Sequence, residues 1–153
     1  MPEFKPYTNR KMRLKSECPT SWTVRNLVRR PGREFEDVVI SSPRLGHNPD
    51  KGAIIELSLY PDAVYAAIPA TKDEEALEDE LAKTMRESPC KVGRYKAACF
   101  ETTNQLGARI RHYVVKRHDG RFTLSFVVNP ATIWSDYQET FDHFLHSFEF
   151  IDE

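Results

Sequence analysis

The sequence lacks the short motifs that identify the common enzymatic chemistries. It contains no GxSxG nucleophile elbow, no HExxH zinc helix, no CxxC pair and no GxGxxG or GxxxxGK[ST] phosphate loop. It also contains no apolar run close to the roughly 20 residues that a membrane helix needs. These absences favour a non-enzymatic protein that has no cofactor and does not span a membrane.

Cysteine is scarce, and the beginning of the chain has no apolar stretch typical of a secretory signal. The three cysteines are Cys18, Cys90 and Cys99, an odd number without metal-ligand spacing. We expect reduced, packed thiols and a cytoplasmic protein. A Cys90–Cys99 bridge is the open alternative, and it requires the chain to turn back near Val92 and Gly93.

Basic residues are concentrated at the N-terminal end, although the net charge of the chain is only −1. Residues 1–33 hold nine basic and two acidic residues. Residues 1–18 are therefore predicted to be a basic lead-in, either mobile or strand-like, and residues 19–153 a single domain. Such an arm can bind an anionic surface or dock on its own body. It carries no nucleic-acid motif, so nucleic acid is not the expected partner.

Hydrophobic periodicity predicts strands through most of the chain and a helix in two places. Alternating and β-branched runs indicate strands, and wider apolar stripes indicate helices. Asp119-Gly120 between two alternating runs indicates a hairpin. The predicted strands are residues 22–28, 35–41, 53–60, 93–101, 108–117, 121–129 and 148–151, and the predicted helices are residues 71–87 and 132–147.

These elements predict one α+β domain. We expect a single, mainly antiparallel twisted sheet of about six or seven strands with helices packed on its faces, as in an α/β/α sandwich. The unit from Leu106 to Ile151 carries the strongest signals, because a hairpin is followed there by an aromatic helix. A monomer or a homodimer is compatible with this pattern.

Two charged surfaces are candidates for binding a protein partner. One is a basic hairpin on the predicted fifth and sixth strands, and the other is the acidic first half of the predicted helix 71–87. Rows of arginine also protect sheet edges, and acids near a helix N-terminus also stabilise the helix dipole, so each surface has a purely structural explanation. The candidate residues are Arg109, Arg111, Arg117 and Arg121 in the hairpin, and Glu75, Glu78 and Asp79 in the helix.

A small metal protein or enzyme is the alternative function. On the last predicted helix, Glu139–His143 and Asp142–His146 are i, i+4 pairs, a spacing that can chelate a divalent metal, with His143 and His146 as candidate ligands. The same spacing is common on a solvated helix face. Nucleophilic chemistry would need a cysteine–histidine or serine–histidine pair within the sheet. Its candidates are Cys99, His112 and Ser125.

Several short segments together resemble a known family over residues 19–151. They are Pro19-Thr-Ser-Trp22 at the start of a strand, Gly93 followed by Ala97, the hairpin Arg109–Val128, and the ending Leu145-His-Ser-Phe148-Glu-Phe150. This pattern resembles the PsbP-like superfamily. That superfamily includes extrinsic photosystem II subunits, a Ran-binding import factor, bacterial lipoproteins and chaperones of type VI secretion effectors. The resemblance implies an accessory or chaperone-like protein-binding domain without catalytic residues.

Overall fold

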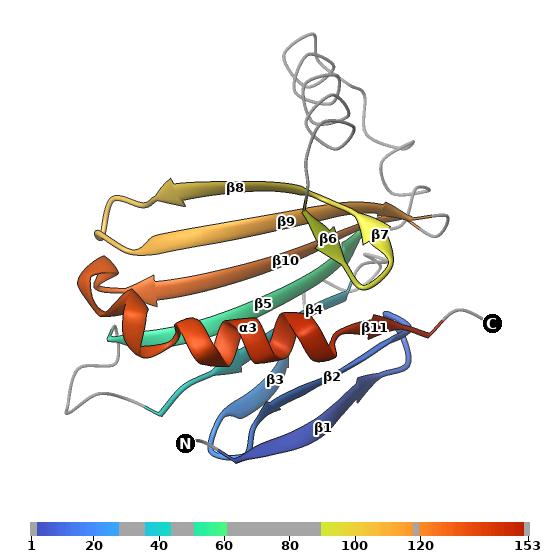
Figure 1. The fold of residues 1–153 in the computed structure, drawn as a ribbon, viewed down its shortest axis with the longest axis horizontal. Coiled ribbons are helices and arrows are strands. Elements are labelled where there is room, and N and C mark those ends of the chain that lie inside the picture. Colours follow the sequence, from blue (N-terminus) through green and yellow to red (C-terminus); the bar gives the residue numbers. More distant parts are fainter. Residues whose placement is uncertain (1–2, 28–35, 44–50, 61–89, 118–119, 152–153) are drawn as a thin grey trace, which may run out of the picture.

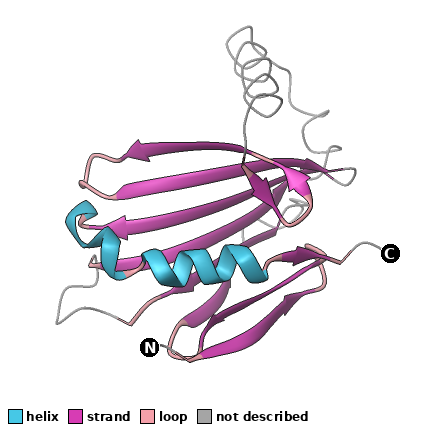
Figure 2. Ribbon diagram, viewed as in Figure 1, coloured by secondary structure: helices cyan, strands magenta, loops and turns pink. Residues whose placement is uncertain are grey.

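Strands make up most of the described chain. The computed structural model describes residues 3–27, 36–43, 51–60, 90–117 and 120–151 (Figure 1). The described strands form antiparallel sheets of three, six and two strands (Figure 2). The elements are β1 (Phe4–Asn9), β2 (Leu14–Pro19), β3 (Thr23–Leu27), β4 (Glu36–Ser41), β5 (Gly52–Tyr60), β6 (Lys91–Val92), β7 (Tyr95–Lys96), β8 (Ala98–Thr103), β9 (Arg109–Arg117), β10 (Gly120–Asn129), η1 (Ala131–Asp136), α3 (Gln138–Ser147) and β11 (Glu149–Phe150).

The largest sheet has the strand order β3-β4-β5-β10-β9-β8. Its inner strand β10 alternates as the sequence predicts, with four apolar side chains buried on one face: Phe122, Leu124, Phe126 and Val128. The predicted pairing of β9 with β10 is confirmed, with Leu124 opposite Tyr113 in the antiparallel register. This apolar face carries the core.

The C-terminal segment covers that face, as Figure 1 shows for α3 in front of β5. The Phe141 ring stacks on the Phe126 ring with centroids 4.5 Å apart. The sequence predicts one continuous helix here, but a 3-10 helix and an α-helix meet at Tyr137, whose φ of −114° departs from helical geometry. The break lets Trp134 and Phe141 both enter the core, where each is at most 5% exposed.

The N-terminal residues form two strands, the strand-like alternative of the predicted lead-in. β1 pairs with β2, and β2 pairs with the closing strand β11 to give the three-stranded sheet. Leu14, Ser16 and Cys18 point inward and are buried. The Ser16 hydroxyl donates a hydrogen bond of 2.7 Å to the Phe144 carbonyl at the end of α3. The basic arm therefore docks on its own body, one of the alternatives that the charge pattern left open.

The predicted fold class is wrong. The described chain does not form one sheet sandwiched between helices, because its strands belong to three sheets and its two described helices lie together on one face of the six-stranded sheet. The physical reason is the N-terminal hairpin. It pairs with β11 and packs on α3, so that it forms a second, separate sheet beside the helix. The predicted acidic helix 71–87 lies outside the described residues.

The predicted strand 93–101 is also divided. Gly93 adopts a φ of 61° in the turn between β6 and β7, a conformation that favours glycine. Only from Ala98 does the chain join the large sheet as β8. Among the described helices, none combines the length and apolar character that crossing a membrane requires.

Candidate functional site

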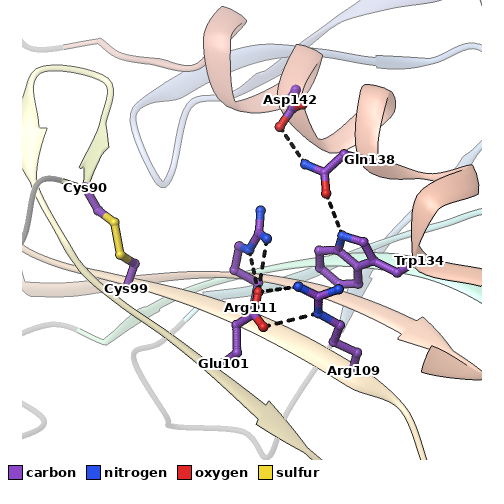
Figure 3. Close-up of polar contacts among 8 residues, drawn as sticks. All are labelled: Cys90, Cys99, Glu101, Arg109, Arg111, Trp134, Gln138 and Asp142. Atoms are coloured by element: carbon purple, nitrogen blue, oxygen red, sulfur yellow. Dashed lines mark hydrogen bonds and ion pairs between the residues drawn. A yellow bond between two sulfur atoms is a disulfide. The ribbon is translucent and has the colours of Figure 1, made fainter. Parts of the chain in front are cut away.

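Two arginines and one glutamate form a cluster where β8 and β9 run side by side (Figure 3). The Arg109 guanidinium donates two hydrogen bonds to Glu101, from Nη2 to Oε1 at 2.8 Å and from Nε to Oε2 at 3.2 Å. Arg111 Nε donates to the same Oε1 at 3.1 Å. Cross-strand register explains the meeting, because Glu101 lies directly opposite Arg111 and diagonally from Arg109. We call these three residues the arginine cluster.

The indole ring of Trp134 lies beside the arginine cluster. The Arg109 and Arg111 guanidinium carbons lie 4.3 and 5.0 Å from the centroid of the indole ring, within cation–π range. The Trp134 Nε1–H donates to Gln138, and the Gln138 amide donates in turn to Asp142. Figure 3 shows this chain of contacts leading from the sheet edge into α3. The two arginines therefore hold η1 against the sheet as well as carrying charge.

The arginine cluster has an excess positive charge. The hydrogen bond from Arg109, followed by the one from Arg111, lowers the pKa of Glu101 despite the opposing effect of burial. Glu101 is therefore ionised at neutral pH and neutralises one of the two guanidinium groups. Each guanidinium has five N–H donors, so both retain donors for a second carboxylate.

The four predicted arginines do not form one surface. Arg117 is 4% exposed, and its guanidinium carbon lies 4.1 Å from the Phe150 ring centroid, inside the molecule. Arg121 lies opposite Lys116 on the face of the sheet that is turned away from Phe122 and Phe126. The cause is strand alternation and the docking of β11, which closes over the end of β9. The acidic candidates Glu75, Glu78 and Asp79 lie outside the described residues.

The structure does not assemble the alternative metal site within the described chain. His143 turns toward the N-terminal hairpin, stacks on Phe4 with ring centroids 3.7 Å apart, and places Nε2 3.1 Å from Glu17 Oε1. Asp142 accepts a hydrogen bond from Gln138. Nowhere in the described chain do three potential metal ligands converge. No contact links Glu139 or His146 to these residues in the described chain.

The cysteines differ from the expectation of three reduced thiols. Cys90 and Cys99 form a disulfide, with Cα atoms 6.1 Å apart (Figure 3). Cys99 lies opposite Tyr113 and His112 lies opposite Phe100, so alternation puts Cys99 and His112 on opposite faces and removes that pair as a candidate. Cys18 stays reduced and buried, and burial raises the pKa of its thiol, which disfavours the reactive thiolate.

Two of the residues named from the sequence, His112 and Ser125, come together on the opposite face of the large sheet. His112 Nδ1 lies 3.1 Å from Ser125 Oγ, and His112 Nε2 lies 2.9 Å from Thr102 Oγ1. Phe100, which is 44% exposed, stacks on the imidazole ring. Burial lowers the pKa of His112. Ser125 is only 5% exposed, so its hydroxyl is a hydrogen-bond partner rather than an accessible nucleophile. Thr102 and Phe100 were not predicted from the sequence, because their contacts with His112 depend on the cross-strand register.

Comparison with known proteins finds likenesses among solved structures alone. No protein-family model matches the chain, and no curated protein matches it. Among solved structures, it is similar to the solution structure of cyanobacterial PsbP (CyanoP) from Synechocystis sp. PCC 6803. The match covers 98% of this chain and 94% of that chain, with 15% identity and a TM-score of 0.43. That protein carries the name PsbP, the family that the sequence motifs of this chain resemble. A likeness of this strength establishes neither the architecture nor the function of this chain.

Proposed function

We propose that this chain is a non-enzymatic accessory domain that binds an acidic protein partner through the basic edge formed by β6 to β9. The charge distribution is the observation that carries the proposal. Without the buried Arg117, residues 91–117 contain six lysines and arginines against the single acid Glu101, a net charge of +5 in a chain whose net charge is −1. A concentration of positive charge on neighbouring strands attracts a negatively charged partner and speeds its association.

Like charges lie directly opposite each other in the β6–β7 hairpin. Lys91 pairs with Lys96, and both are exposed. Like charges in directly opposed positions destabilise a sheet, so they work against folding in the isolated chain. A bound acidic segment would offset this repulsion.

Charge reversal on the β6–β7 hairpin tests the proposal. The double variant Lys91→Glu/Lys96→Glu changes exposed side chains and leaves the contacts of Arg109 and Arg111 with Trp134 in place. Binding of a fluorescein-labelled oligoglutamate peptide is measured by fluorescence anisotropy at low and at physiological ionic strength. We expect the double variant to weaken binding by about tenfold or more, and salt to weaken binding by the unmodified protein.

A matched double variant separates a local site from overall charge. Arg10→Glu/Lys51→Glu makes the same change in net charge at exposed positions outside β6 to β9. We expect that variant to change the affinity by less than about twofold. Equal losses in the two double variants would show that only net charge matters and would refute a binding edge. A partner captured from the native host by the unmodified chain, and lost with Lys91→Glu/Lys96→Glu, would then identify the natural ligand.

A further inference from the structure

The strand β8 ends the six-stranded sheet: β9 pairs with its inner side, and no strand of the described chain pairs with its outer edge (Figure 1). Its residues Phe100, Glu101, Thr102 and Thr103 are all exposed. Proteins protect such edges with charged side chains, above all lysine, with proline or with a bulge, because an open strand edge pairs with other chains. The sequence of β8, Ala-Cys-Phe-Glu-Thr-Thr, contains neither lysine nor proline, and its one charged residue, Glu101, is bound by Arg109 and Arg111 of β9. It is rich in residues that favour strands.

The hydrogen-bond pattern shows which backbone groups of β8 face outward. Asn104 N–H donates to the Ala108 carbonyl at 3.1 Å, so Asn104 faces β9. Groups alternate along a strand, so Thr102 and Phe100 also face β9, whereas Thr103 and Glu101 face outward. Ala97 lies four residues before Glu101, so its backbone groups face the same, outward side. Its N–H donates to the Cys90 carbonyl at 3.0 Å. The outer side of this chain segment thus already accepts one backbone partner.

We infer that β8 accepts an extended acidic segment of a partner protein as an added antiparallel strand. This inference rests on the proposed function and states how the acidic partner is held. Antiparallel pairing uses both outward groups of Glu101 and of Thr103. Backbone hydrogen bonds provide affinity, and the side chains on the two faces of β8 provide specificity.

The two faces of β8 define the chemistry of the added strand. Glu101 and Thr103 point to the face that carries Arg109 and Arg111, while Phe100 and Thr102 point to the face that carries His112. A glutamate opposite Thr103 stands about 10 Å from the β9 backbone, two strand spacings, and can reach the Arg109 guanidinium. A neutral residue of the added strand fits opposite Glu101, because a second acid there would repel it. An apolar residue opposite Phe100 can pack beside the ring that Phe100 stacks on His112.

The test uses the capped, fluorescein-labelled peptide Glu-Val-Thr-Val-Glu and two N-methylated forms. In the inferred pairing the glutamate and threonine amides face β8 and the valine amides face solvent. Methylating the glutamate and threonine nitrogens is expected to weaken binding about tenfold or more, because the hydrogen bonds to β8 are lost. Methylating the two valine nitrogens, which leaves the charge and the residue sequence unchanged, is expected to change the affinity by less than about threefold.

A protein variant supplies the reciprocal test. Thr103→Pro removes an outward N–H while the neighbouring Thr102 and Asn104 keep their bonds to β9, and edge strands tolerate proline. We expect loss of peptide binding with an unchanged circular dichroism spectrum. If this variant fails to fold, the methylated peptides still decide the question on the unmodified protein.

Several results would overturn the inference. Equal binding of the two methylated peptides, still sensitive to Lys91→Glu/Lys96→Glu, would refute strand addition and leave the proposed function standing. Absence of binding by every acidic peptide would refute both. A dimer in light scattering that Thr103→Pro dissociates would show that the edge is occupied by a second copy of this chain. Tighter binding of a single-stranded oligonucleotide than of the peptide would assign the basic edge to nucleic acid.

Discussion

Replacing Phe141 by alanine tests the packing of α3 on the large sheet. Phe141 is 1% exposed, its ring stacks on Phe126 at 4.5 Å, and it lies 5.2 Å from the Trp134 ring. Truncation of a buried phenylalanine costs about 3–5 kcal/mol, and aromatic pairs of this kind contribute about 0.5–1.5 kcal/mol of that loss each. With two such partners, we expect a loss of about 4 kcal/mol in the free energy of unfolding.

Urea denaturation followed by tryptophan fluorescence measures this loss. A domain of this size has a total stability on the order of 5–15 kcal/mol, so the variant is expected to unfold at a much lower urea concentration with an unchanged slope. Phe100→Ala is the matched control, because it removes the same atoms from a side chain that is 44% exposed. We expect the control to lose less than about 1 kcal/mol. A loss below about 1 kcal/mol for Phe141→Ala would refute the packing of α3 described above.

Three further predictions concern the disulfide, His112 and the arginine cluster. Thiol labelling of the denatured, unreduced protein should detect only Cys18, and labelling of all three cysteines would contradict the Cys90–Cys99 bridge. Burial lowers the pKa of His112, so the unfolded chain takes up its proton first, near pH 6.5. Neutral His112 therefore contributes its full share to the free energy of unfolding above about pH 6.5. This contribution is lost as the pH falls from there through the lower pKa that His112 has in the folded protein. Urea midpoints at pH 7.5 and 5.5 should differ less for His112→Gln than for the unmodified protein. A double-mutant cycle between Glu101 and Arg109 should give a coupling of about 0.5–1 kcal/mol, because the pair is partly exposed. A coupling of zero would mean that the pair adds nothing to stability.

The sequence predicts the large sheet better than the rest of the fold. β10 places Phe122, Leu124, Phe126 and Val128 at alternate positions, so its pattern alone determines the strand and its inner face. The alternation rule does not predict β2, because Ser16 occupies an inward position. There, hydrogen bonds to Phe144 and Ser147 satisfy its hydroxyl. A buried serine makes the alternation of a strand look polar. The missing strands then led to a wrong fold class, because they form the second sheet.

The candidate site could be predicted only in part, because side-chain partners depend on register. Arg109 and Arg111 were identified from charge, but their contacts with Glu101 and Trp134 follow from strand pairing and from the break at Tyr137. Arg117 has the same charge and lies in the same strand, yet it is covered by β11. The arginine cluster thus joins a structural role, holding η1, to the positive charge that the proposed partner would meet.

Hydrogen exchange at the amides of β8 tests the central claim most directly. The amides of Glu101 and Thr103 face outward, so we expect them to exchange rapidly in the free protein, whereas those of Phe100 and Thr102 are protected by β9. Saturating amounts of the acidic peptide should slow exchange at Glu101 and Thr103 and leave Phe100 and Thr102 nearly unchanged. Peptide binding that leaves the exchange of Glu101 and Thr103 as fast as before would contradict the account.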